Sequence, residues 1–78
     1  MVNTLLLDDA IKESGKSKKF LAKKCGMTPQ SFRRKRKNLS PFNSDDVDIL
    51  CAELDIKTLK RKDSIFFAKS VEKMPTST

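Results

Sequence analysis

The residues with the most evident chemistry lie between Gly26 and Asn38, in the stretch GMTPQSFRRKRKN. This stretch ends in five consecutive cations, which run from Arg33 to Lys37. Guanidinium and ammonium groups bind phosphates and carboxylates, so the run suits a polyanionic partner. The alternative is that it forms only a solvated helix surface, and its charge alone does not separate the two interpretations.

Catalytic chemistry is not expected from this chain. The sequence has no histidine, so the commonest general base is absent, and so is a frequent metal ligand. Its two cysteines, Cys25 and Cys51, have no CxxC spacing, which argues against a zinc site and against a redox motif. Both fall in apolar patterns, and we expect them to be reduced core residues. We therefore predict a protein that is not an enzyme and that has no catalytic residue, metal site or cofactor.

The charge is segregated along the chain. From Lys12 to Lys37 there are eleven Lys or Arg and one acid, whereas residues 38–56 hold five acids and no base. Solubility does not require such segregation, and the net charge of +7 points the same way. The pattern predicts one face built for a polyanion and another that is not.

The elements that must position these residues are expected to be helices. Strand-like alternation of β-branched residues is absent, and apolar residues recur at helical spacing. The predicted fold is all-α, a compact domain of four to five helices. The first helix runs from about Thr4 to Ser14 and Gly15 ends it; the others have as start signals Ser17, Thr28 with Pro29, Asn43, and Ile56 with Leu59.

A chain of 78 residues holds one domain. We predict that it covers residues 1–73, and that residues 74–78, MPTST, form a disordered tail. The N-terminal sequence lacks the long apolar run of a signal peptide or membrane span, so no membrane partner is expected. The expected location is the cytoplasm.

The spacing around Gly26 is the most specific pattern in the chain. A helix that ends at Gly26 is followed after Met27 by the cap of the next helix, Thr28. A short turn with glycine at its start sets two helices at a large angle, and Ala22 supplies the small side chain needed inside that angle. The second helix is then turned outward, and its length suits the major groove of DNA.

At this point the sequence resembles the Cro/repressor helix-turn-helix family, the lambda repressor-like regulators of phages and bacteria. The segments KKFLAKKCGMTPQSFRRKRKN and FNSDDVDILCAELDI carry the resemblance, together with SIFFAKSV near the C-terminus. It covers roughly Leu5 to Val71 and rests on these positions taken together: Ala22, Gly26, Gln30 to Phe32, Phe42, Leu50, Leu54 and Ile56.

The resemblance implies a transcriptional regulator that binds double-stranded operator DNA and occludes a promoter. Its place would be the bacterial host cell, at the nucleoid. The residues implied to contact bases are Gln30, Ser31 and Arg34, and we add Arg33 as a base or phosphate contact. Those implied to contact phosphates are Lys18, Lys37, Asn38 and Ser40, and we add Lys19 and Lys35, with a solvated position as the alternative for Lys35.

Two positions depart from the family pattern. Pro29 stands where relatives have a contacting residue, but it has no donor, so its work would shift to Gln30. Arg36 stands where an apolar residue is usual. We predict a structural role for Arg36: either its stem covers the core at the end of the helix, or it pairs with an acid of the fourth helix, such as Asp46 or Asp48.

Three consecutive apolar residues, Ile65, Phe66 and Phe67, cannot all point inward from one helix or strand. One or two should cap the core, and the remainder would be a protein-partner contact. A homodimer through this segment would place two recognition helices about one DNA turn apart.

Two rival functions remain open at this point. One is a small phage switch protein that modulates transcription by binding another repressor protein. The other is a nonspecific nucleic-acid or RNA-binding protein, which would need the charge but not the turn at Gly26.

Overall fold

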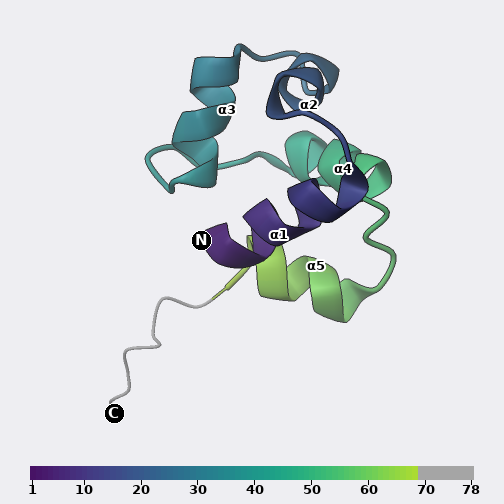
Figure 1. The fold of residues 1–78 in the computed structure, drawn as a ribbon. Helices are drawn as coiled ribbons and strands as arrows, with labels where there is room; N and C mark the ends of the chain where they lie inside the picture. The colour runs from purple at the N-terminus through teal and green to yellow at the C-terminus, as the bar shows by residue number, and fades with distance from the viewer. Residues whose placement is uncertain (69–78) are drawn as a thin grey trace.

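A computed structural model describes residues 1–68 of the chain. This part contains five α-helices and no strand, as the sequence predicts for an all-α domain (Figure 1). None of these helices is long and apolar enough to cross a membrane. The helices are α1 (Thr4–Ser14), α2 (Lys18–Lys24), α3 (Pro29–Arg36), α4 (Ser44–Glu53) and α5 (Leu59–Phe66).

Each helix begins at a polar cap whose side chain accepts a hydrogen bond from a backbone N–H of the first turn. These caps are Asn3, Ser17, Thr28, Asn43 and Thr58. Gly15 ends α1 in the left-handed region, with φ of 73°, and its N–H donates to the Lys12 carbonyl. The predicted bounds of α1 and the predicted caps Ser17, Thr28 and Asn43 are therefore confirmed.

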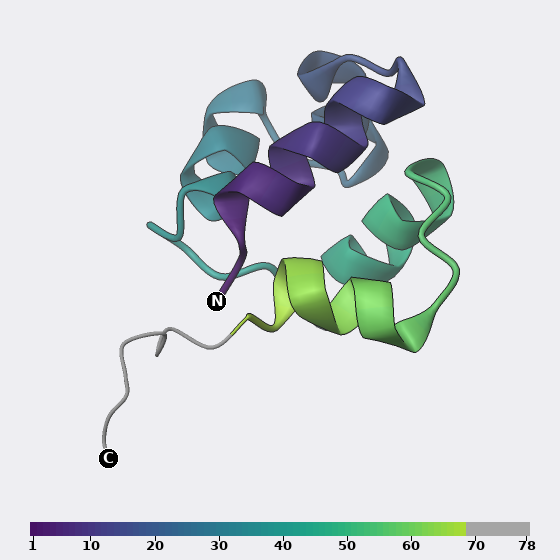
Figure 2. The ribbon, with the colours of Figure 1, turned by 60° about the horizontal axis from the view of Figure 1, so that its bottom comes forward.

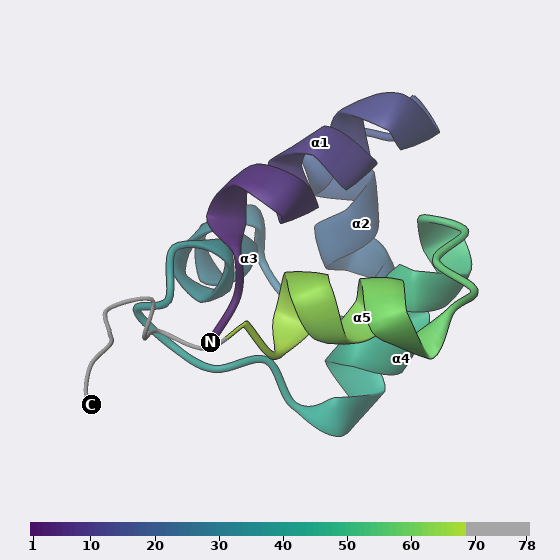
Figure 3. The same ribbon diagram turned by 90° about the horizontal axis from the view of Figure 1, so that it is seen from below.

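Three pairs of helices make the most extensive contacts. Helices α1 and α5 pack against each other, and α2 packs against both α3 and α4. Figure 1 shows α2 and α3 at the top of the molecule and α5 at the bottom, and in Figure 3, seen from below, α1 and α5 lie nearer to the viewer than α2 and α3. In the view of Figure 2, α1 and α5 lie in front, and α2 and α3 lie behind them.

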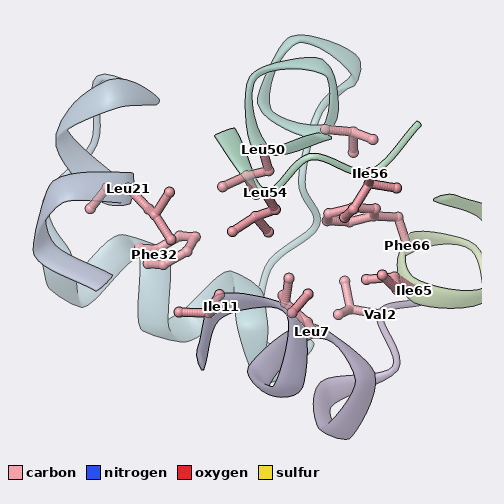
Figure 4. Close-up of a cluster of buried hydrophobic side chains, with 13 residues drawn as sticks. Val2, Leu7, Ile11, Leu21, Phe32, Leu50, Leu54, Ile56, Ile65 and Phe66 are labelled. Atoms are coloured by element: carbon pink, nitrogen blue, oxygen red, sulfur yellow. The ribbon is translucent and has the colours of Figure 1, made fainter. Parts of the chain in front are cut away.

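The core lies where the apolar stripes of all five helices meet (Figure 4). Leu7, Leu21, Phe32 and Leu50 are fully buried and come from four different helices. The fifth helix adds Ile65 and Phe66. Phe42, from the α3–α4 connection, packs edge-on against Phe32 at a centroid distance of 6.1 Å and against Phe66 at 5.9 Å. Phe42 therefore lies between α3 and α5.

The C-terminal segment is helical as far as Phe66, so Ile65 and Phe66 belong to a helix and not to an extended segment. Residues 69–78 lie outside the described part, and with them the end of the predicted domain at residue 73 and the predicted tail 74–78.

Residues 2–4 tie the end of α3 to the end of α5. The Val2 N–H donates to Asn38 Oδ1 at 2.8 Å, and Asn38 Nδ2 donates to the Val2 carbonyl at 2.9 Å. The Thr4 hydroxyl donates to the Arg36 carbonyl at 2.9 Å, and the Asn3 N–H to the Ile65 carbonyl at 2.7 Å. The start of the chain therefore holds the last turn of α3 in place.

Asn38 also ends α3 by adopting the left-handed conformation, with φ of 63°. We expect Asn38→Gly to lower the free energy of unfolding by about 1 kcal/mol through the lost bonds to Val2. Asn38→Ala should lower it by roughly 1 kcal/mol more, since alanine is strained at positive φ. Urea denaturation of the three proteins measures both steps. A glycine variant as stable as the parent would show that the bonds to Val2 contribute nothing.

Candidate functional site

The connection between α2 and α3 is as short as the sequence predicts. Cys25 caps α2, and Gly26 follows with φ of 72°, which glycine adopts without strain. The Met27 N–H donates to the Ala22 carbonyl at 3.0 Å, and Thr28 then caps α3 with Pro29 at its first position. Ala22 is fully buried, as expected for a small side chain at the approach of two helices.

One face of α3 is directed to solvent. Gln30, Arg33, Arg34 and Lys37 are exposed, and their spacing of three and four residues puts them on the same side of the helix. With Leu39 they line a shallow hollow of about 300 Å³. The opposite side of α3 carries Phe32 into the core. The structure thus gathers three of the four predicted base-contacting residues on one surface, whereas Ser31 is half-buried beside it.

The cations of the chain divide into two groups by their partners. Seven Lys or Arg side chains lie within 4.0 Å of a carboxylate. Within residues 1–68 the others have no acid partner: Lys12, Lys18, Lys19, Lys23, Arg33, Arg34, Lys37 and Lys60. Six of these eight belong to α2, to α3 or to the residue that caps α3. The unneutralised charge is therefore concentrated on the α2–α3 end of the molecule.

The run of five cations is accordingly not one patch. Arg33, Arg34 and Lys37 face solvent, whereas Lys35 Nζ lies 3.0 Å from Asp46 Oδ2 and Arg36 is buried. An α-helix turns by about 100° per residue, so five consecutive side chains cannot share a face.

Arg36 has the structural role that the sequence predicts, but with a different acid. It is 8% exposed, and its guanidinium lies 5.1 Å from the Phe32 ring centroid. Its Nη1 lies 3.4 Å from Asp8 Oδ1 of α1, and its Nε has no hydrogen-bond partner. The expectation of Asp46 or Asp48 as partner is wrong, because Asp46 is held by Lys35 and Asp48 pairs with Lys62.

The predicted phosphate-contacting residues do not form one uniform set. Lys18 and Lys19 are exposed in the first turn of α2, and Lys37 is exposed at the end of α3. Ser40 is half-buried in the following loop. Lys35 and the Asn38 side chain have internal partners instead, Asp46 and Val2, so neither side chain is available to a phosphate in this structure.

The predicted partner contact is smaller than expected. Ile65 and Phe66 are buried in the core, so only Phe67, at 55% exposure, offers an apolar surface. Two of the three residues cap the core, in agreement with the sequence prediction.

The cysteines show no reactive environment. Cys25 and Cys51 are free and partly buried against the core, and desolvation by burial raises the pKa of each thiol. A raised pKa leaves less thiolate at neutral pH. In residues 1–68 no three Cys, Asp or Glu side chains converge as a metal site.

Leu39 is the site residue that the sequence reasoning missed. It is exposed, and it lines the hollow next to Arg34 and Lys37. Its place follows from Asn38: with Asn38 in the left-handed region, the Leu39 N–H donates to the Arg34 carbonyl at 2.9 Å and closes the helix end. The signal in the sequence was Asn38 itself, because asparagine just after a helix often adopts the left-handed conformation that ends it.

Comparison of the chain with models of protein families, with curated proteins and with solved structures gave no match.

The environment of Arg36 leads to a prediction about stability. Arg36→Met keeps an apolar stem over Phe32 and removes the unpartnered Nε, so its free energy of unfolding should stay within about 1 kcal/mol of the parent. Arg36→Ala also removes the stem and should lose about 2 kcal/mol. Thermal and urea unfolding compare the three proteins. A methionine variant that loses as much stability as the alanine variant would mean that the ion pair with Asp8, which both variants lack, and not the packing of the stem, is what holds this position.

Proposed function

We propose that the protein is a sequence-specific regulator that binds double-stranded DNA, with α3 in the major groove and α2 across the backbone. The observation that carries the proposal is the exposed face of α3, where Gln30, Arg33, Arg34 and Lys37 have no acid partner among the described residues. Outside α2, α3 and its cap Lys37, most of the described cations lie near an acid, and within residues 1–68 the exceptions are Lys12 and Lys60. A surface left with unpaired cations and a glutamine suits a polyanion that is also read by hydrogen bonding.

The side chains on this face match the donor and acceptor pattern of base edges. Glutamine pairs through two hydrogen bonds with adenine, and arginine does the same with guanine, in the major groove. Each such pair contributes about 1–3 kcal/mol of discrimination against a wrong base. Gln30 and Arg34 are the proposed readers, with Arg33 and Ser31 at their sides.

Of the proposed phosphate contacts, Lys37 belongs to the end of this face and two others belong to α2. Lys18 and Lys19 come from the start of α2, and Lys37 from the end of α3. Contacts of this kind position the protein and supply affinity on any sequence. The mode of action would be occlusion of a promoter, as in the Cro-like repressors that the sequence resembles, and it requires no enzymatic activity.

The readers and the phosphate contacts should respond differently to mutation. We expect Gln30→Ala and Arg34→Ala each to reduce discrimination against substituted base pairs by about 1–3 kcal/mol at single positions of the operator. Lys18→Ala should weaken binding to all sequences alike and lower the salt slope of log K by about one. Fluorescence anisotropy with operator and random duplexes at several salt concentrations measures both quantities.

Lys60→Ala is the matched control for Lys18→Ala. Lys60 is also exposed and without an acid partner in residues 1–68, but it belongs to α5, at the side of the molecule opposite to α2 and α3 (Figure 1). It should leave DNA affinity almost unchanged. Unaltered selectivity in both α3 variants would refute the assignment of α3 as the reader. Weak, salt-sensitive DNA binding combined with a tight complex with another repressor would favour the rival function of a switch protein.

A homodimer belongs to the same proposal, because one domain presents one α3 and two-fold operators are bound by paired domains. Phe67 is the exposed remnant of the predicted partner contact. We expect sedimentation velocity on operator DNA to show two proteins per duplex, and we expect Phe67→Ser to weaken binding of the second copy. One protein per duplex at saturation would exclude the dimer.

A further inference from the structure

Asp46 holds a cation of α3 while it also caps α4. Its side chain is 6% exposed, and Oδ2 accepts hydrogen bonds from the Asn43 N–H at 3.2 Å and from Lys35 Nζ at 3.0 Å. Its own N–H donates to Asn43 Oδ1 at 2.8 Å, which completes a capping box. Its carboxylate therefore serves the fourth helix and the third helix at once.

The cap does not require the charge on Asp46. The capping function needs one acceptor for the Asn43 N–H, and a neutral amide side chain offers one. The contact with Lys35 is a separate feature, and it takes place in a partly desolvated site, since Lys35 is 21% exposed. Buried ion pairs are weak contributors to net stability, so stability alone does not explain this pair.

The consequence of the pair is electrostatic. Lys35 stands in the middle of five cations, and an ammonium group on this helix would otherwise be free to bind a phosphate. Its two neighbours in the sequence lie in different environments: Arg34 faces solvent and Arg36 is buried. Asp46 makes the contact with Lys35 that a phosphate oxygen would make.

We propose that Asp46 is a specificity-determining residue that acts by withholding Lys35 from DNA phosphates. The proposal rests on the DNA-binding function proposed above. Nonspecific binding is essentially all electrostatic, so one fewer phosphate contact weakens it directly. In the specific complex α3 has a fixed orientation, and Lys35 lies on its α4 side, away from the reading face. Withholding Lys35 therefore disfavours random DNA more than the operator.

The test compares Asp46→Asn with the parent on random-sequence duplex DNA. The asparagine keeps an acceptor for the Asn43 N–H but frees Lys35. We expect the salt slope of log K to become steeper by about 0.9 and the affinity for random DNA to rise, with the rise over the parent about threefold larger at 50 mM than at 200 mM salt. Affinity for the operator should rise less, so the ratio of specific to nonspecific affinity should fall.

Asp45→Asn is the matched control. Asp45 is the neighbouring acid in the same turn of α4, it is exposed, and among residues 1–68 it pairs with no cation. It changes the net charge by the same amount and should not change the slope. An equal effect of the two substitutions would overturn the proposal, since net charge alone would then explain both.

The double variant Lys35→Gln/Asp46→Asn separates the freed cation from damage to α4. If the freed cation is responsible, the double variant returns to the parent slope, whereas a loosened capping box would leave it perturbed. Lys35→Gln alone covers the case in which Asp46→Asn does not fold, because it leaves the cap intact. It should keep the parent affinity for random DNA, whereas Lys37→Gln should lower it; equal losses in both would show that Lys35 already contacts phosphate.

Acylation of lysines with a small amine reagent, read by mass spectrometry without DNA, reports the pair directly. Lys35 should react more slowly than Lys37 in the parent and as fast as Lys37 in Asp46→Asn. Equal rates in the parent would overturn the proposal even if the protein binds DNA. If the parent protein did not bind an operator more tightly than random DNA, the proposed function would be refuted. The acylation rates would still report whether Asp46 holds Lys35.

Discussion

The third helix has only one apolar side chain that anchors it in the core. Which of its cations face solvent therefore depends on what fixes its rotation. Its eight residues include a single large apolar side chain, Phe32, which is fully buried. A helix of two turns with one anchor has little packing to fix its rotation about its own axis. The rotation matters, since a turn of one position would replace Arg34 by Lys35 on the outer face.

Polar contacts on three sides supply what packing does not. Lys35 reaches Asp46 of α4, Arg36 stacks over Phe32 and reaches Asp8 of α1, and Asn38 is clamped to Val2. The Thr4 hydroxyl adds a bond to the Arg36 carbonyl. The partners lie both before and after α3 in the sequence. Together these contacts fix the rotation of α3 so that Gln30, Arg33 and Arg34 face outward. The same contacts also decide which cations remain free.

The fold, and not only the run of cations in the sequence, thus decides where positive charge remains without a nearby acid. Acids from α1, α4 and the α4–α5 loop neutralise cations away from the outer face of α3. Lys16 shows the same use of acid: its Nζ contacts Glu53 Oε1 at 2.9 Å, and this hydrogen bond lowers the pKa of Glu53. For a polyanion-binding protein this arrangement limits how much of its charge can attract an arbitrary partner. Among residues 1–68, the cations of the proposed DNA-binding face have no acid partner.

The sequence by itself determined the bounds of the first helix and the starts of the next three, because the signals for these ends are local. The start expected at Ile56 with Leu59 is only partly right, since α5 begins at Leu59, after its cap Thr58. Asn3, Ser17, Thr28, Asn43 and Thr58 satisfy backbone groups within their own turns, and Gly15 and Gly26 adopt positive φ without help from distant residues. It also determined that Phe32 is buried and that Gln30, Arg33 and Arg34 share a face, since helical spacing decides both.

Only the tertiary structure decided the partners or the burial of Lys35, Arg36, Asn38 and the three residues Ile65 to Phe67. Their partners, Asp46, Asp8, Val2 and the core, lie on other elements, and a one-dimensional pattern does not say which acid or which cavity reaches a given side chain.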